Sequence, residues 1–351
     1  MDNKLTKVGI LGGSGFTGEE LLRILSNHSR TEVIAVSSRE LLGQSTNKIV
    51  EGSNLSFIEP DNDIFFECEA VFFATPHGVS MNKVKSFLKS NIKVIDLSAD
   101  FRLKDLKNWE EWYNLKHAQK ELLSESVYGL TELNCNKIKS ARLVAVPGCY
   151  PTSSLLGLLP LLNSELEIDS IIIDAKSGIS GAGRKKVENG LSKDINENFK
   201  AYGLEGHRHL PEISEVLQNV SGYPIKLSFL PHLIPAMRGI YSTIYIQIKD
   251  LKGLNIRTMY ESYYHDSPNV RIMRSGEVPD IKSVSNTNNC DISISFSSIE
   301  NQVIIISSID NLIKGAAGQA VECYNLMHGF NQSKGLRDRK STRLNSSHLL
   351  I

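Results

Sequence analysis

The feature that most constrains the fold is a glycine-rich segment close to the N-terminus. Residues 13–18, Gly-Ser-Gly-Phe-Thr-Gly, fit the pattern G-x-G-x-x-G, and Gly12 adds one more glycine ahead of it. The segment follows a short apolar run, Lys7–Leu11, and precedes Glu19–Leu25, whose leucines recur at helical spacing. Glycines permit a tight turn and a close approach of the backbone to a pyrophosphate, and the following helix offers free N–H groups. In this context the pattern predicts nucleotide binding rather than a glycine-rich turn without a ligand. The expected contacts are Gly12, Gly13, Ser14, Gly15, Phe16, Thr17 and Gly18.

Short apolar runs continue along the first half of the chain and predict a parallel sheet. They lie at Thr31–Val36, Ala70–Ala74, Lys93–Leu97 and Leu143–Val146, with a helix-like segment at Ser80–Leu88. Alternation of strands and helices with short connections favours a sheet with helices on both faces. After Pro151 a helix, Ser153–Leu162, precedes five strand-like segments. Several of them alternate apolar with polar residues, which is typical of a sheet with one buried face. These segments are Ser170–Asp174, Ile225–Leu230, Tyr241–Lys249, Asp291–Ser297 and Val303–Ile309.

The predicted fold class is therefore α/β: a Rossmann-type dinucleotide-binding domain followed by an α+β domain with a mixed, largely antiparallel sheet. We expect residues 1–149 to form the first domain and residues 150–312 to form the second. A C-terminal helix within about 313–335 is expected to rejoin the first domain. Residues 336–351 are rich in Ser, Arg and Asn and lack periodicity, so we expect a disordered or non-native tail.

Composition excludes several classes of function. The chain has 351 residues with 39 basic and 39 acidic side chains, and this balance argues against a nucleic-acid-binding protein. The sequence has no apolar stretch near the roughly 20 residues that a membrane span needs. The five cysteines are odd in number and widely spread, which predicts neither a disulfide framework nor a metal site. A reducing, cytoplasmic location is expected.

The end of the second predicted strand indicates which nucleotide binds. An NAD site usually carries an acidic residue here to hold the ribose 2′-hydroxyl. This chain reads Val-Ser-Ser-Arg at 36–39, and hydroxyls with a guanidinium suit a 2′-phosphate. NADP is favoured, with Ser38 and Arg39 as its contacts, although Glu40 lies close by.

Cys149 is the strongest candidate for a nucleophile. It follows a predicted strand within Pro-Gly-Cys-Tyr-Pro-Thr (147–152) and precedes a helix expected to begin near Pro151. At a helix N-terminus we expect the pKa of the thiol to fall toward the thiolate form. For the four other cysteines (Cys68, Cys135, Cys290 and Cys323) the expected role is that of a small buried apolar residue.

A cysteine thiolate beside a nicotinamide suggests attack on an activated acyl group, followed by hydride reduction of the resulting thioester to an aldehyde. This chemistry needs a proton carrier near neutral pH, and His207 and His209 form the richest histidine cluster. They make a poor zinc site, because no third ligand lies at a usual spacing. His77 and His232 also lie in turns, where a structural role is expected. A second glycine-rich loop, 177–184, either passes close to the nicotinamide or is merely flexible. Two arginines in loops near strand ends, Arg102 and Arg238, are either anion clamps or solvated surface residues.

Taken together, these motifs resemble the N-acetyl-γ-glutamyl-phosphate reductases of the semialdehyde dehydrogenase superfamily over about residues 7–335. The motifs are GGSGFTG (12–18), TPHG (75–78), LSADFR (97–102), YGLTEL (128–133), PGCYPT (147–152), SGISGAGR (177–184), GHRHLPEI (206–213) and PHLIP (231–235). Phe16 stands where tyrosine is common, and Ala236 and Met237 precede Arg238 where a more polar neighbour is expected.

The resemblance implies NADPH-dependent reduction of N-acetyl-glutamyl 5-phosphate to the 5-semialdehyde, with release of phosphate, in arginine biosynthesis. It implies that Cys149 forms the thioester and that His207 or His209 is the acid/base, with His207 preferred. Substrate contacts would be Arg102, Arg184 and Arg238, and further cofactor contacts Thr75, Pro76, Ser177, Gly178 and Gly181. The resemblance also implies that residues 150–312 form the catalytic and dimerisation domain, and that a homodimer or homotetramer is built through its sheet. The alternatives are a related enzyme acting on aspartyl phosphate or on a carrier-protein-linked acyl phosphate, or a non-catalytic NADP-binding paralogue.

Overall fold

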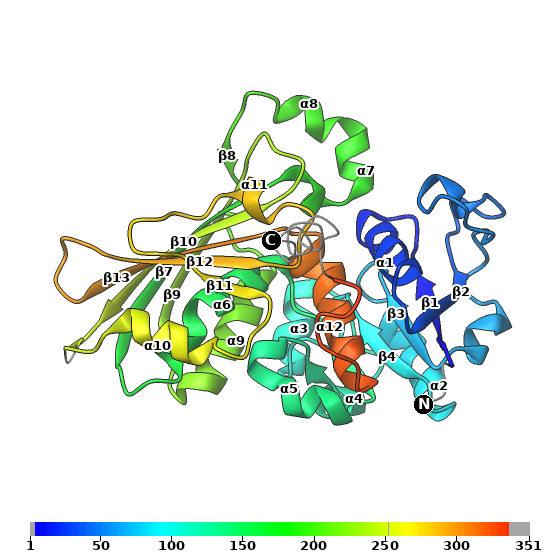
Figure 1. Ribbon diagram of the computed structural model, residues 1–351, viewed down its shortest axis with the longest axis horizontal. Helices are drawn as coiled ribbons and strands as arrows, with labels where there is room; N and C mark the ends of the chain where they lie inside the picture. The colour runs from blue at the N-terminus through cyan, green and yellow to red at the C-terminus, as the bar shows by residue number, and fades with distance from the viewer. Residues whose placement is uncertain (1–3, 252, 337–351) are drawn as a thin grey trace, which may run out of the picture.

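The computed structural model describes residues 4–251 and 253–336, which form two β-sheets with helices packed around them (Figure 1). The first sheet has six strands in the order β2-β1-β3-β4-β6-β5, and every pairing in it is parallel. Its strands are β1 (Thr6–Leu11), β2 (Thr31–Val36), β3 (Ala70–Phe73), β4 (Lys93–Asp96), β5 (Val127–Tyr128) and β6 (Leu143–Ala145). The prediction of a parallel, Rossmann-type sheet is confirmed.

Both faces of this sheet are covered, which explains why its strands are apolar at almost every position. All four residues of β3, Ala-Val-Phe-Phe, are buried. One face packs against α1 (Phe16–Ser26), α5 (Thr131–Ser140) and α12 (Gly318–Met327). The other packs against α2 (Val84–Lys89), α3 (Leu106–Tyr113) and α4 (Lys120–Glu125). The predicted helix at Ser80–Leu88 is a 3-10 turn, Ser80–Asn82, followed by α2.

The second sheet has seven strands in the order β11-β12-β13-β10-β7-β9-β8. The β7–β9 and β11–β12 pairings are parallel and the others antiparallel, so the predicted mixed, largely antiparallel sheet is confirmed. The strands are β7 (Ile168–Ser177), β8 (Lys200–Ala201), β9 (Lys226–Leu233), β10 (Ile240–Ile248), β11 (Val270–Ile272), β12 (Cys290–Phe296) and β13 (Gln302–Ile309). Burial alternates along β10, because one face packs against helices and the other is open.

The buried face of the second sheet carries α6 (Cys149–Leu162), α9 (His209–Ser221) and α10 (Ile256–Tyr263). Helix α6 begins two residues before the Pro151 expected from sequence. Pro151 is accommodated because the N–H groups of a first helical turn need no intrahelical partner. The remaining α-helices of the described residues are short: α7 (Arg184–Lys186), α8 (Ser192–Asp194) and α11 (Ile281–Val284).

After β13 the chain returns to the first sheet through a π-helical turn, Ile313–Ala317, and α12. Helix α12 contacts α1, α5 and β4, as Figure 1 shows. The C-terminal helix expected within about 313–335 is thus divided between these two elements. The predicted terminal tail lies, apart from Leu336, outside the described residues.

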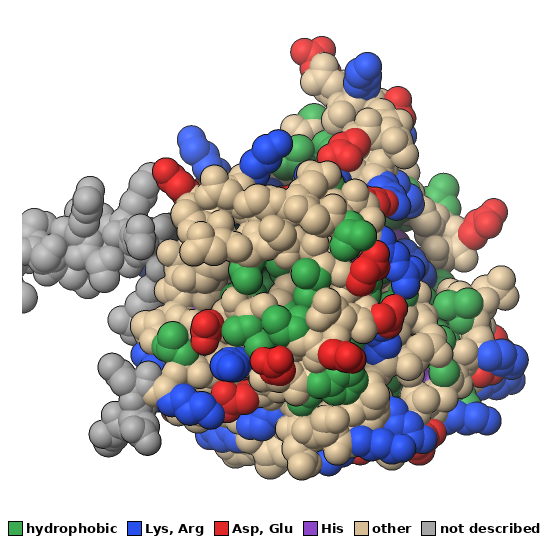
Figure 2. All heavy atoms as spheres, turned by 90° about the vertical axis from the view of Figure 1, so that its right-hand side faces the viewer, with side chains coloured by type: hydrophobic (Ala, Val, Ile, Leu, Met, Phe, Trp, Pro, Cys, Tyr) green, Lys and Arg blue, Asp and Glu red, His purple; other side chains and the backbone are tan. Residues whose placement is uncertain are grey.

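Surface charge agrees with the balanced composition. On the face shown in Figure 2, basic and acidic side chains are interspersed. Among the residues that the structure describes, none of the helices is long and apolar enough to cross a membrane.

Candidate active site

The glycine-rich segment forms one wall of a cleft of about 670 Å³ at the carboxyl ends of β1 and β3. The glycines are needed because the chain is close-packed here. A Cβ added to Gly12, whose φ is +86°, would lie 2.5 Å from the Ala74 carbonyl oxygen, and one on Gly18 would lie 2.2 Å from the Gly12 oxygen. Helix α1 begins at Phe16, and no side chain of the described residues caps its N-terminal N–H groups. These N–H groups remain available to an anion.

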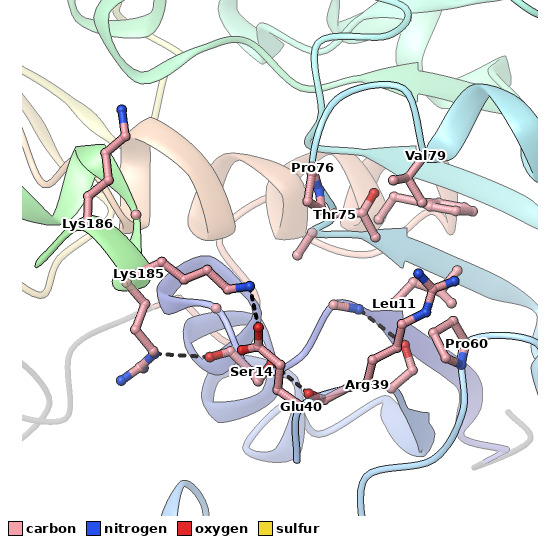
Figure 3. A pocket seen from close by; sticks show the side chains of 18 of the residues that line it. Leu11, Ser14, Arg39, Glu40, Pro60, Thr75, Pro76, Val79, Lys185 and Lys186 are labelled. Atoms are coloured by element: carbon pink, nitrogen blue, oxygen red, sulfur yellow. Dashed lines mark hydrogen bonds and ion pairs between the residues drawn. The ribbon is translucent and has the colours of Figure 1, made fainter. Parts of the chain in front are cut away.

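The end of β2 contributes hydroxyl and charged groups to the same cleft. Ser37 accepts a hydrogen bond from the Gly12 N–H (3.2 Å), and the Ser38 hydroxyl donates to Ser14 (2.8 Å). Arg39 lines the cleft, and the Glu40 carboxylate forms an ion pair with Lys185 of α7, which follows the second glycine-rich loop. Figure 3 shows Lys185 and Glu40 meeting across the cleft. Because Lys185 compensates Glu40, the Glu40 charge does not dominate this end of the cleft, and Arg39 can meet a phosphate.

A second cavity, of about 490 Å³, adjoins the cleft and is lined by the predicted catalytic residues. Cys149, His207 and His209 line it, together with His77 and Tyr113. Residues that line both spaces are Gly15, Ala74, Thr75, Pro76, Ala182, Gly183 and Arg184. The structure therefore brings the sulfur and both imidazoles into a space that opens onto the glycine-lined cleft.

The second glycine-rich loop lies between the two spaces, but its residues face different ways. Ser180, Gly181, Ala182 and Gly183 line the second cavity. Ser177 is buried, and Gly178 packs behind the wall, where an added Cβ would lie 2.7 Å from the Met237 carbonyl oxygen. In this structure Gly181 faces the cavity, whereas Ser177 and Gly178 shape the loop behind it.

Cys149 is the first residue of α6, and its neighbours hold it tightly. The N–H of Gly148 donates to Glu212 (2.9 Å), and a Cβ on Gly315 would lie 2.9 Å from the Cys149 Cβ. Burial raises the pKa of the Cys149 thiol to about 11, while Arg102 and the Tyr150 N–H lower that pKa by less. The expectation of a lowered pKa is wrong for this structure, because desolvation outweighs the favourable helix end. The Cys149 thiol is therefore protonated near pH 7, and its conversion to the thiolate would need a neighbouring base.

The imidazole of His209 lies directly against the residue before the cysteine. A Cβ added to Gly148 would lie 2.4 Å from His209 Nε2. His209 Nδ1 is buried and has no hydrogen-bond partner among the described residues. His207 Nδ1 accepts a hydrogen bond from the His209 backbone N–H (3.1 Å), which leaves the proton of neutral His207 on Nε2. Burial lowers the pKa of His207 to about 4 and that of His209 well below its ordinary value, so both are neutral bases near pH 7.

Arg102 is buried, 8% exposed, behind the cysteine loop. Its guanidinium donates to the carbonyl oxygens of Val146 and Leu97 (both 2.8 Å) and to Glu212 (3.3 Å). Glu212, 1% exposed, also accepts from the Tyr128 hydroxyl (2.8 Å). Arg102 lines the second cavity, but several of its donors are used to fix the strand end before Cys149.

The two other candidate arginines link the first sheet's helix to the second domain. Arg184 donates to the Ser14 carbonyl oxygen (3.0 Å), pairs with Glu19 (2.5 Å) and stacks on the Phe16 ring (4.4 Å). Arg238 pairs with Glu20 of α1 and with Asp310, which follows β13. Arg184 lines both cavities, whereas Arg238 lies beside them and braces α1.

Sequence reasoning missed several residues of the second cavity. Arg208, Tyr113 and Asn311 line it, and His77, expected to be structural, does so too. The position of Arg208 between two histidines was an available signal, as was the spacing of Glu212, which lies three residues after His209 on one helix face. Within the described residues, no group of three His, Cys, Asp or Glu side chains is arranged to hold a metal ion.

Comparison with known proteins places this geometry in a family. Residues 7–141 match the family model described as semialdehyde dehydrogenase, NAD binding domain, and residues 149–311 match semialdehyde dehydrogenase, dimerisation domain. The N-acetyl-gamma-glutamyl-phosphate reductase of Nitrosococcus oceani is 47% identical over 338 residues, covering 95% of this chain and 98% of the relative. The chain belongs to the N-acetyl-gamma-glutamyl-phosphate reductase family. Another member, from Laribacter hongkongensis, is 44% identical over 337 residues, with the same coverage of both chains.

Solved structures of semialdehyde dehydrogenases share the fold of this reductase family member. Aspartate semialdehyde dehydrogenase II of Vibrio cholerae, complexed with ASA, superposes with a TM-score of 0.73 at 16% identity, covering 93% of this chain and 99% of the other. The aspartate semialdehyde dehydrogenase of Candida albicans, with NADP, superposes with a TM-score of 0.67 at 16% identity and the same coverage. At this level of identity the likeness concerns the fold.

Proposed function

We propose that this chain catalyses the NADPH-dependent reduction of N-acetyl-L-glutamyl 5-phosphate to N-acetyl-L-glutamate 5-semialdehyde and phosphate, a step of arginine biosynthesis. One observation carries the proposal: Cys149, at the start of α6, shares a cavity with His207 and His209, and that cavity opens onto the glycine-lined cleft. The names of the 44–47% identical relatives supply the substrate.

The residues of the cleft suit a dinucleotide phosphate. The uncapped start of α1 would hold the pyrophosphate, and Ser38 and Arg39 would hold the 2′-phosphate. Thr75, Pro76 and Gly181 line the path from the cleft to Cys149. NADPH, when bound there, supplies the hydride that reduces the thioester to the aldehyde.

In the proposed mechanism the Cys149 sulfur attacks the acyl carbon, the bond from that carbon to the phosphate oxygen breaks, and a thioester remains. His209 is the proposed acid/base, because its ring lies against Gly148 and its Nδ1 has no partner among the described residues. This choice departs from the preference for His207 at the sequence level. His209 takes the thiol proton before attack and returns a proton when the carbon–sulfur bond breaks.

Arg102 is proposed to act mainly as a positioning residue, because it ties the strand end before Cys149 to Glu212. Arg184 is proposed to hold the second glycine-rich loop against the cofactor segment through Ser14 and Glu19. Arg238 is proposed to brace the two domains rather than to touch the substrate.

The test is the reverse reaction with purified protein. Semialdehyde, inorganic phosphate and NADP are supplied, and NADPH formation is followed by its absorbance. We expect turnover of N-acetyl-glutamate semialdehyde well above that of aspartate semialdehyde. Cys149→Ser should abolish turnover and leave NADPH binding, measured by fluorescence, nearly unchanged. Equal or faster turnover of the aspartate compound, or a fully active Cys149→Ser variant, would refute the proposal.

We also propose a homodimer or homotetramer, consistent with the dimerisation domain of the family. The open face of the second sheet carries exposed apolar side chains, including Ile172 (51% exposed) on β7 and Leu230 (36% exposed) on β9. Ile172→Asp should convert the assembly to a monomer in light scattering, and an unchanged mass would contradict this interface. A cytoplasmic location is proposed because all five cysteines are free thiols.

A further inference from the structure

We propose that Arg208 binds an oxyanion of the acyl-phosphate substrate, an inference that rests on the proposed function. Arg208 lies between His207 and His209, directly before α9, and its side chain is exposed. It lines the same cavity as Cys149. A cation at this point meets the substrate on the side where the imidazoles act.

The charges of the cavity wall single out this residue. Arginine side chains line the cavity at Arg102, Arg184 and Arg208, and no carboxylate of the described residues lines it. Glu212 neutralises Arg102, and Glu19 with Glu188 neutralises Arg184. Arg208 forms neither a hydrogen bond nor an ion pair with the described residues, so its charge and its five donors are available.

The histidines of the cavity do not supply a competing positive charge. Burial lowers the pKa of His77 to about 3 and that of His207 to about 4, so both are neutral near pH 7. An acyl phosphate with a remote carboxylate brings two anionic groups into this space. Both groups present a planar or tetrahedral set of oxygens, which a guanidinium recognises through paired hydrogen bonds.

The Arg208 guanidinium also lies over the ring of Tyr113. The Arg208 Cζ lies 5.8 Å from the centre of the Tyr113 ring. Tyr113 in turn stacks on the buried Trp109, with ring centres 5.1 Å apart. A cation resting on a fixed ring loses less conformational freedom when it binds an anion.

The test measures protection of Cys149 from alkylation, which does not depend on turnover. The full-length protein is treated with iodoacetamide, a neutral reagent, and the labelling of Cys149 is followed by mass spectrometry. Inorganic phosphate and N-acetyl-glutamate are the two protecting probes. The variants are Arg208→Gln, Arg208→Lys and, as a matched exposed arginine outside both cavities, Arg274→Gln.

We expect Arg208→Gln to raise the half-protecting concentration of at least one probe by roughly 10- to 100-fold, as loss of charged hydrogen bonds predicts. Arg208→Lys should show a smaller rise, and Arg274→Gln none. The probe that shifts identifies the bound oxyanion as phosphate or carboxylate. Unchanged protection by both probes in Arg208→Gln, no protection of the wild type, or an equal shift in Arg274→Gln would overturn the inference. A shift in a protein that turns over neither semialdehyde would retain Arg208 as an anion site and refute the proposed function alone.

Discussion

Substituting Gly148 by alanine tests whether the imidazole of His209 must lie against the cysteine loop. The backbone of Gly148 has φ −65° and ψ 156°, a conformation that alanine adopts without strain. The added Cβ, however, would lie 2.4 Å from His209 Nε2, 2.7 Å from its Cδ2 and 2.8 Å from its Cε1. To reach an ordinary contact the ring must withdraw by about 1 Å.

Such a displacement should lower kcat on the order of 100-fold, because a catalytic group misplaced by an ångström loses its alignment. Overpacking should lower the free energy of unfolding by about 1–3 kcal/mol, which leaves the protein folded. The assay combines the reverse reaction, NADPH binding by fluorescence and thermal unfolding. NADPH affinity should not change, because Gly148 lines only the second cavity.

A double-mutant cycle supplies the control. In a His209→Ala background the added methyl group has room, so Gly148→Ala should cause almost no further loss of stability or activity. Activity of Gly148→Ala within about threefold of the wild type would refute the reasoning, since a 1 Å shift of a required group cannot be that harmless. Equal effects of Gly148→Ala in both backgrounds would show that the clash lies elsewhere.

Three further predictions concern buried charge. Because burial raises the pKa of Cys149 to about 11, inactivation of the free protein by iodoacetamide should accelerate about tenfold per pH unit between pH 7 and 10, and a plateau below pH 8 would contradict this pKa. Burial and the neighbouring Asp100 raise the pKa of Asp96 from 3.8 to about 7. The folded protein therefore binds a proton at Asp96 that the unfolded chain releases, and this proton adds to the free energy of unfolding at low pH. That added stability is lost as the pH rises from about 4 to 7. In urea unfolding, Asp96→Asn should remove that fall in stability, and parallel pH profiles for the two proteins would argue against it. The Lys314 ammonium is fully buried between the carboxylates of Glu132 (2.7 Å) and Glu322 (2.6 Å). Lys314→Met should therefore lower the free energy of unfolding at pH 7 by about 3–5 kcal/mol, because it leaves buried negative charge without a partner. The loss should be smaller at pH 5, where a carboxylate can take up a proton. If Lys314→Met lowers the free energy of unfolding equally at pH 5 and pH 7, an uncompensated carboxylate is not the cause of the loss.

The sheets could be predicted because a strand buried on both faces leaves a continuous apolar run in the sequence, whereas a strand buried on one face leaves an alternation of apolar and polar residues. Residues 70–73 are apolar throughout and form a central strand of the parallel sheet, whereas residues 240–248 alternate and form a half-open strand. Strands β5, β8 and β11 were not predicted, since segments of two or three residues carry little periodicity. The division of the chain at 149/150 stays a prediction.

The site was harder to predict because it depends on packing between distant segments. A glycine-rich loop reads the same whether a glycine faces a ligand, as Gly181 does, or packs behind the wall, as Gly178 does. The pKa of Cys149 follows from desolvation by the surrounding fold rather than from its helix position. Likewise, the partner of Arg102, Glu212, lies 110 residues away and is not visible in the local sequence.

The return of the chain end to the first sheet has a consequence for how the protein matures. The face of that sheet packed by α1 is closed by Val321 and Tyr324 of α12, among the last residues described. A nascent chain that has emerged only as far as Leu143–Ala145 therefore has every strand of the nucleotide-binding sheet but still exposes one apolar face of it to water. Synthesis must pass Tyr324 before that face is covered, so the first sheet cannot complete its packing until every strand of the second sheet has been made.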